Sequence, residues 1–315
     1  MEKTLLIGNG LNLAMGGITW SDLLSSICPP DLRIQTADER DQVPQPIQFE
    51  MIGVKENSCP YRRGIDSYSS LKKKIRERLE EQPYRFGWLH ESVYRTNADN
   101  IITTNYDYAL EEASKEWNPS DARQWSSNQK YLFTATGRTA DIDFFHCHGV
   151  SNIASSICVG YEHYMGYVHH MRSLLVNHGN DNIDSDKPRI AYILDGKVEE
   201  PKKKWPLLFF ESDVAIIGLG LTFSEIDLWW LLTLRAAFFT GNPESKIRMN
   251  NIVYYDVAEL VNPGDRNLQE KEMMGSSKAL ALSGLEVQYR PVIESSYTAG
   301  YAKVLQSLQT GEGWK

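Results

Sequence analysis

The sequence predicts an α/β fold in which a parallel sheet is covered by helices on both faces. Short apolar runs rich in β-branched residues alternate along the chain with longer runs of helical periodicity, as in βαβ units. The short runs are apolar throughout, as expected of parallel strands that are buried on both faces. Four of them end in glycines or small polar residues, and ligands bind beyond the carboxyl ends of such strands.

These two patterns predict the individual elements. Strands are expected at residues 3–7, 100–104, 144–149, 214–217, 251–255 and 286–289. Helices are expected at residues 22–27, 67–81, about 108–117, 161–178, 224–239 and 298–308. Ser21 is the expected cap of the first helix, and the basic cluster at 72–74 is expected to face solvent.

The chain is expected to form one domain over residues 1–315, with insertions at about 28–98 and 166–206. Residues 28–66 hold paired prolines and little periodicity, which predicts an irregular excursion. Residues 179–205 are polar and rich in Lys and Glu, which predicts a surface excursion. Hydrophobic residues make up 42% of the 315, enough for a sizeable core.

Composition argues against several classes of protein. With a formal net charge of −8, the chain lacks the excess of basic residues that is typical of dedicated nucleic-acid or membrane-surface binders. No apolar run approaches the roughly 18 residues of a membrane helix, and the N-terminus does not resemble a secretory signal. The four cysteines form no CxxC pair, so reduced thiols, a cytoplasmic location and no metal are expected.

Glycines and an asparagine follow the first predicted strand. Gly8 and Gly10 would let the backbone turn tightly near a phosphate, with Asn12 and the start of the next helix beside it. The spacing is not the dinucleotide fingerprint GxGxxG, because residue 13 is Leu. A plain turn between strand and helix is the alternative.

Polar residues also follow the second strand, at Thr104, Asn105 and Asp107. An Asn at a strand end can hold a ribose hydroxyl and a water together, because its amide both donates and accepts. The alternative is structural: Asp107 caps the next helix and Asn105 stabilises the turn.

His148 follows the third strand and is a candidate general base, since imidazole gains or loses a proton near neutral pH. His146, two residues earlier, is expected on the same strand face, so a metal pair must be considered. No third ligand lies at a recognisable spacing, and a structural histidine is the alternative.

The last two candidates follow the 214–217 and 251–255 strands. Gly218, Gly220 and Leu221 form a turn suited to a phosphate or ribose. The Ser224–Asp227 spacing fits a capping box at the start of the next helix. Asp256 directly follows its predicted strand. In dinucleotide-binding α/β folds, an acidic residue in that position accepts a hydrogen bond from a ribose hydroxyl.

In this order, GNG at 8–10, TTNYD at 103–107, HG at 148–149 and GLGL at 218–221 resemble the SIR2-like family. The resemblance is closest to the bacterial SIR2-like NAD-consuming proteins of antiphage defence. It covers roughly residues 3–30, 98–165 and 212–260 and implies a Rossmann-like sheet with NAD lying across it.

The resemblance also implies roles for matching positions. Asn105 and His148 would be catalytic, with Asn105 placing the nucleophile and His148 acting as base. The cofactor-binding positions would be Gly8, Gly10, Asn12, Thr104, Asp107, Gly218, Gly220, Leu221 and Asp256. Family deacetylases carry two zinc-binding CxxC pairs and a Pro-Asp-Phe-Arg run, and both are missing from this sequence.

Cleavage of NAD by water is therefore the expected function, with NAD as substrate and no zinc module. An NAD- or ADP-ribose-sensing module without turnover is the first alternative, and a protein deacylase or ADP-ribosyltransferase is the second. Because unchecked NAD cleavage is hazardous to a cell, control by a homo-oligomer or a partner protein encoded nearby is expected. No membrane or direct nucleic-acid partner is expected.

Overall fold

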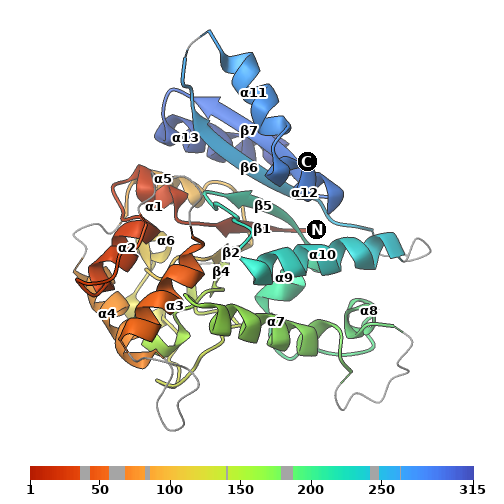
Figure 1. The fold of residues 1–315 in the computed structure, drawn as a ribbon. Coiled ribbons are helices and arrows are strands. Elements are labelled where there is room, and N and C mark those ends of the chain that lie inside the picture. Colours follow the sequence, from red (N-terminus) through yellow and green to blue (C-terminus); the bar gives the residue numbers. More distant parts are fainter. Residues whose placement is uncertain are drawn as a thin grey trace.

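The computed structural model describes residues 1–35, 43–56, 68–81, 86–139, 141–178, 187–241, 248–262 and 264–315. Within them the chain forms a seven-stranded sheet flanked by helices, which confirms the predicted α/β, Rossmann-like class (Figure 1). The strands are β1 (Glu2–Ile7), β2 (Asn100–Thr103), β3 (Gly137–Thr139), β4 (Ile142–His146), β5 (Ser212–Ile217), β6 (Ile252–Glu259) and β7 (Gln288–Glu294). The helices are α1 (Gly10–Ala14), α2 (Trp20–Ile27), α3 (Gln45–Lys55), α4 (Ser69–Glu80), α5 (Trp88–Val93), α6 (Ala109–Glu112), α7 (Tyr161–Leu175), α8 (Arg189–Leu194), α9 (Trp205–Glu211), α10 (Ile226–Gly241), α11 (Arg266–Met274), α12 (Ser277–Gly284) and α13 (Tyr297–Thr310).

β1 lies at the centre of the sheet, whose spatial order is β3-β4-β2-β1-β5-β6-β7. Neighbouring strands are parallel except for β3, which is antiparallel to β4. The strands that follow β1 in the chain, β2 to β4, lie on one side of it. The later strands β5, β6 and β7 lie on the other side. The topological switch point therefore lies between β1 and β5, where open α/β sheets bind ligands.

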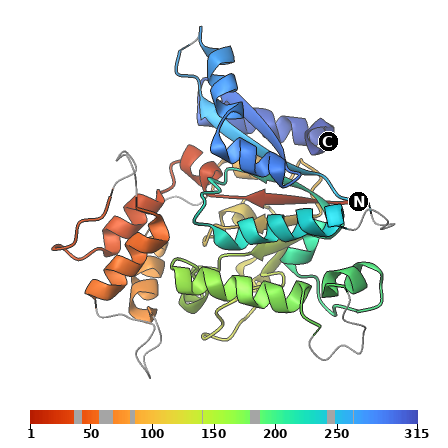
Figure 2. The ribbon, with the colours of Figure 1, turned by 45° about the vertical axis from the view of Figure 1, so that its right-hand side comes forward.

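Both faces of the sheet are apolar, as the uninterrupted apolar runs predict. Successive residues of a strand point to opposite faces. In β5, Val214 and Ile216 join one core with α7, α9 and α10, whereas Ala215 and Ile217 join another with α5 and α13. Figure 2 shows α7 (green) and α10 (teal) side by side across the first of these faces.

A third apolar cluster holds α2, α3 and α4 together at one side of the sheet (Figure 2, red to orange). Its members include Leu24, Ile52 and Ile75. The prediction of an irregular segment over 28–66 is therefore wrong for α3, while residues 36–42 and 57–66 lie outside the described residues. The helix was not predicted because its apolar residues lie on two opposite faces, 47, 51 and 54 on one and 49 and 52 on the other, so no single apolar stripe stands out.

Several predicted boundaries are also wrong. The helix expected to reach about residue 117 ends at Glu112, where the Ser114 hydroxyl accepts from the Glu116 amide and so competes with helical bonding. The segment 179–205 contains α8, and α11 and α12 precede β7. The cap of α2 is Thr19 and not Ser21, because Thr19 Oγ1 accepts from the Asp22 amide in a capping box.

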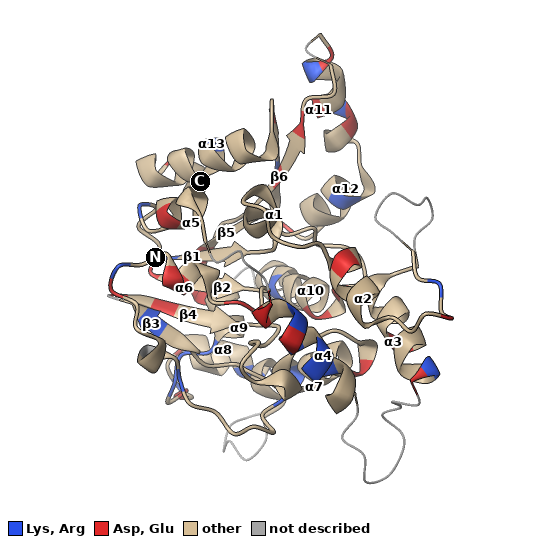
Figure 3. Ribbon diagram, turned by 90° about the vertical axis from the view of Figure 1, so that its left-hand side faces the viewer, with Lys and Arg blue, Asp and Glu red and all other residues tan. Residues whose placement is uncertain are grey.

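The basic cluster of α4 does not lie entirely in solvent. Figure 3 shows basic and acidic residues along this helix, but Lys72 is buried. Its Nζ lies 2.7 Å from His163 Nδ1 and donates to the Ser155 carbonyl oxygen at 3.2 Å. Lys72 therefore packs α4 against α7, and the solvent-facing prediction fails for this residue.

Three of the four cysteines, Cys28, Cys147 and Cys158, are free thiols, and Cys59 lies outside the described residues. Among the helices that the structure describes, none is long and apolar enough to cross a membrane.

Candidate functional site

Two adjoining cavities lie at the carboxyl ends of β1, β2, β5 and β6, at the switch point of the sheet. The first has a volume of about 90 Å³ and the second about 550 Å³. They share the lining residues Asn9, Thr19, Trp20, Thr104, Tyr164 and Glu225. A ligand could therefore extend from one cavity into the other.

Most of the residues singled out in the sequence line these cavities. The first is lined by Asn12, Thr104, Asn105, Asp107 and His148. The second is lined by Gly10, Thr104, Gly218, Gly220 and Asp256. Gly8 and Leu221 line neither, because Gly8 packs against the backbone of Gly218 and Leu221 is buried in the apolar core beside α10.

The two glycine turns pack against each other. Gly10 N donates to the Gly218 carbonyl oxygen at 2.7 Å, and a Cβ on Gly8 would lie 2.5 Å from that oxygen. A Cβ on Gly10 would lie 2.2 Å from Tyr301 Oη. These glycines therefore permit close packing of the β1 and β5 loops, and α1, which begins at Gly10, is five residues long.

Asn105 is buried at the carboxyl end of β2 and faces the first cavity. Its backbone N–H donates to Thr103 Oγ1 at 3.1 Å, and its Nδ2 donates to the Gly8 carbonyl oxygen at 3.4 Å. The side-chain oxygen, Oδ1, has no hydrogen bond to any described residue. It is the atom of Asn105 that remains for a ligand or a water.

Asn12 and Asp107 form a buried network with His90 of α5. Asn12 Nδ2 donates to Asp107 Oδ2 at 2.8 Å, and Asn12 Oδ1 lies 2.9 Å from His90 Nε2. Burial lowers the pKa of His90 to about 4, so its ring is neutral. Because Nδ1 accepts from the Gly87 amide at 3.2 Å, the ring proton lies on Nε2, which donates to Asn12 Oδ1. Asp107 Oδ1 also accepts from the amide of Ala109, the first residue of α6, but the cap position of that helix is Tyr108 and not Asp107 as the structural alternative predicted.

His148 is paired with a carboxylate that the sequence assigned to a helix cap. Its Nε2 lies 3.0 Å from Asp227 Oδ2, and both side chains are buried. The predicted Ser224–Asp227 capping box is therefore wrong: Ser224 bonds Thr222, and the amide of Thr222 donates to Glu225. Burial by itself would lower the pKa of His148. The charge of Asp227, the hydrogen bond to Asp227 and the charge of Glu225 outweigh burial and raise the pKa above 6.5.

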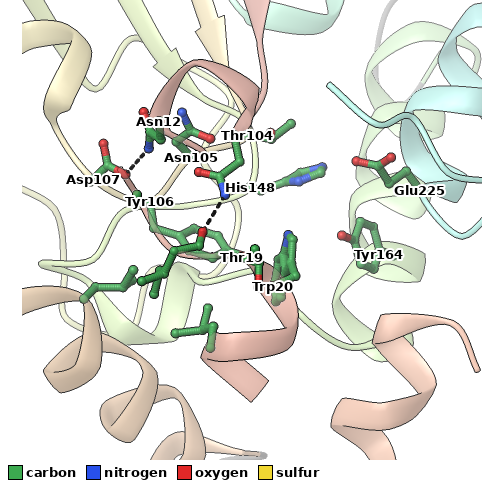
Figure 4. Close-up of a pocket in the computed structure, with 15 residues that line it drawn as sticks. Asn12, Thr19, Trp20, Thr104, Asn105, Tyr106, Asp107, His148, Tyr164 and Glu225 are labelled. Atoms are coloured by element: carbon green, nitrogen blue, oxygen red, sulfur yellow. Dashed lines mark hydrogen bonds between the residues drawn. The ribbon is translucent and has the colours of Figure 1, made fainter. Parts of the chain in front are cut away.

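Figure 4 shows how these groups lie around the first cavity. Asn12, Asn105 and Asp107 occupy one side, Tyr164 and Glu225 the other, and the His148 ring lies between them. Glu225 also borders the second cavity. Burial and the neighbouring Asp227 charge raise the pKa of Glu225 to about 7, although His148 opposes that shift.

His146 does not share a face with His148. β4 ends at His146, and the chain then turns through Gly149, whose φ is 97°, so strand alternation no longer applies at His148. His146 Nε2 lies 2.8 Å from Glu111 Oε1 on α6, and its Nδ1 donates to the Asn105 carbonyl oxygen at 2.8 Å. Among the described residues there is no cluster of potential metal ligands.

Asp256 lies within β6 and does not close the strand as expected, because β6 continues to Glu259 beside β7. Tyr289 Oη donates to Asp256 Oδ2 at 2.7 Å, and Lys278 Nζ lies 3.8 Å from the same oxygen. Its carboxylate borders the second cavity.

Comparison with known proteins adds no relative. The chain matches no protein-family model, and no curated protein is similar to it.

Proposed function

We propose that this protein hydrolyses NAD⁺ to nicotinamide and ADP-ribose. The observation that carries the proposal is the position of Asn105 and His148 in one small cavity, which opens beside a larger cavity at the switch point. The motif resemblance to SIR2-like proteins supports the same assignment.

The linings of the two adjoining cavities suit the two halves of NAD⁺. The nicotinamide ribose would lie in the cavity of about 90 Å³, and the adenosine diphosphate in the cavity of about 550 Å³. Apolar and aromatic side chains with a few polar groups are typical of cofactor sites. Tyr254, Tyr297 and Tyr301 line the larger cavity, where Asp256 could accept from a ribose hydroxyl.

The reaction needs positioning more than a strong acid. When the bond between ribose C1′ and the nicotinamide nitrogen breaks, its electron pair neutralises the cationic ring, so the leaving group needs no proton. Water oxygen then bonds to C1′, and the proton of the water passes to a base. Asn105 Oδ1 would orient the water, and His148 would accept the proton.

Release of nicotinamide from NAD⁺, measured by chromatography, tests the proposal together with NAD⁺ binding by calorimetry. Asn105→Ala and His148→Ala are expected to lose about 10²-fold or more in rate, as is typical when a positioned acid–base group is removed. The exposed Asn128→Ala and His169→Ala are the matched controls and are expected to keep the wild-type rate. Equal rates in all four variants would refute the site, and tight binding without release would favour the sensing module.

The resemblance extends the proposal to antiphage defence in a bacterium, under the control of an oligomer or a partner protein. Cells that carry the gene with its genomic neighbours are expected to lose NAD⁺ on infection, and cells that carry His148→Ala are not. Unchanged NAD⁺ levels in infected cells that resist the phage would contradict this assignment.

A further inference from the structure

We propose that Asp227 is the positioning residue of His148. Its carboxylate accepts a hydrogen bond from Nε2, so Nδ1 is the nitrogen left to accept a proton from a molecule in the first cavity. The role rests on the proposed hydrolysis of NAD⁺, but the contact that carries it is independent of any substrate. Asp227 Oδ2 lies 3.0 Å from His148 Nε2, and the Asp227 side chain is fully buried.

The contact determines which tautomer the neutral imidazole adopts. A carboxylate oxygen can only accept, so the ring proton must lie on Nε2 and the lone pair on Nδ1. Nδ1 has no hydrogen bond to a described residue, and His148 lines the first cavity. Asp227 therefore leaves the base with its lone pair available to water or a ribose hydroxyl.

The start of α10 supplies the carboxylate in a fixed position. Asp227 lies in the first turn of this helix, where an anion is favoured by the helix dipole. Its second oxygen, Oδ1, is buried and has no hydrogen-bond partner among the described residues. A buried carboxylate with an unsatisfied oxygen is costly to keep, so a role towards His148 accounts for a group that packing alone disfavours.

Other polar groups surround His148 without replacing Asp227. On α7, Tyr164 meets the imidazole edge-on at 5.3 Å between ring centroids, Tyr167 lies at 6.4 Å, and the His163 ring stacks on Tyr167 at 5.5 Å. Glu225 faces the ring from the loop before α10. The Cys158 amide donates to the His148 carbonyl oxygen at 2.8 Å, and the Cys147 thiol donates to the Thr103 carbonyl oxygen. Burial lowers the pKa of His163 well below 6.5, so this neighbour is neutral.

The proposal predicts how activity depends on pH. Because Asp227 and Glu225 raise the pKa of His148, the neutral base forms only as the pH rises through that raised value. The acid limb of the kcat profile is therefore expected above pH 6.5. In Asp227→Asn the imidazolium loses its carboxylate, so the limb is expected to move to lower pH.

The decisive variant is Asp227→Asn, which keeps the size of the side chain. Its amide can donate to Nε2 and so favours the tautomer with its proton on Nδ1, which cannot act as base. We expect kcat to fall on the order of 10²–10⁴-fold, the range seen when a histidine base loses its orienting carboxylate. KM is expected to change little, because Asp227 does not reach the cavity.

Asp213→Asn is the matched control. Asp213 also uses one carboxylate oxygen, to accept from the Asn251 amide at 2.8 Å, but it lies at the opposite end of β5 from the site. This variant is expected to keep the wild-type kcat and pH profile. A folded Asp227→Asn protein with a wild-type rate and pH profile would overturn the proposal.

A measurement on the wild-type chain avoids dependence on a variant that fails to fold. Nitrogen-15 NMR of the seven histidines, with His148→Ala for assignment, reports the tautomer of the neutral ring. We expect the proton on Nε2, and a proton on Nδ1 would overturn the proposal. If the wild type released no nicotinamide, the proposed function would fail while the NMR result still tested the Asp227 contact.

Discussion

The buried pair of His146 and Glu111 should make the stability of the protein depend on pH in a definite direction. Both side chains are fully buried, with 2.8 Å between Nε2 and Oε1. Nδ1 donates to the Asn105 carbonyl oxygen, so a second proton is needed between Nε2 and the carboxylate. Burial lowers the pKa of His146, but the charge and hydrogen bond of Glu111, with the Asn105 carbonyl, raise it above 6.5.

The sign of the effect follows from linkage. A histidine whose pKa is higher in the folded than in the unfolded state stabilises the fold fully below the unfolded value. That stabilisation is lost as the pH rises through the folded pKa. The thermal midpoint of the wild type is therefore expected to fall on the alkaline side of about pH 6.5, where unfolded histidine titrates.

Glu111→Gln tests this reasoning because Gln has nearly the same size and its amide can donate to a neutral Nε2. A hydrogen bond to a charged group contributes roughly 1.5–3 kcal/mol and a neutral one roughly 0.5–1.5 kcal/mol. The variant is therefore expected to lose about 1–2 kcal/mol near pH 6 and almost nothing near pH 9. Glu111→Ala leaves a buried histidine without its partner and is expected to cost about 3–5 kcal/mol.

Thermal unfolding followed by circular dichroism across this pH range measures the effect. At roughly 2–4 °C per kcal/mol, the loss near pH 6 is easily resolved. Glu116→Gln, at an exposed position, is the control and is expected to follow the wild type at every pH. Parallel curves for wild type and Glu111→Gln would refute the reasoning, because they would mean that no proton is bound between His146 and Glu111.

Two further predictions concern the loops of the site. Asn12→Ala removes the partner of both Asp107 and His90 and is expected to cost about 1–3 kcal/mol in chemical unfolding. It is also expected to weaken NAD⁺ binding in calorimetry, and an unchanged affinity would exclude Asn12 from the site. Gly10→Ala brings Cβ within 2.2 Å of Tyr301 Oη and 2.7 Å of Gly218 Cα, so a loss of about 1–3 kcal/mol is expected. Gly241→Ala is its control, because the new Cβ would meet no described atom within 4 Å outside its own helical turn, and equal stability of the two variants would contradict the packing argument.

The parts of the fold that could be predicted from sequence are those that depend on neighbouring residues. Strands such as β1 and β5 are apolar on both faces because both faces are covered, and that pattern is visible over a few residues. Gly10, Asn105 and Gly218 follow β1, β2 and β5, and they line the cavities because the carboxyl ends of parallel strands meet at one edge of the sheet. α3 was missed because its apolar residues are spread over two opposite faces, of which only the face with Phe49 and Ile52 is buried in the cluster with α2 and α4.

The polar contacts that hold the site could not be predicted, because they join residues far apart in the chain. Asp227 has the local spacing of a helix cap, but its partner is His148, 79 residues earlier. Glu111 carried no signal at all, although it bonds His146, 35 residues later. The one sequence feature that pointed to a carboxylate near His148 was the pair of acidic residues, Glu225 and Asp227, that follows the glycine loop at 218–220.

The two histidine–carboxylate pairs make assembly of the proposed site depend on both layers of helices. His146 and His148 leave the same end of β4, but one reaches Glu111 on α6 and the other Asp227 on α10. The apolar residues of these helices belong to the two cores on opposite faces of the sheet. Asn105, whose carbonyl oxygen accepts from His146, and His148, the proposed base, can therefore take their places only when both cores are packed. A variant that loosens either core should reduce turnover before it unfolds the protein.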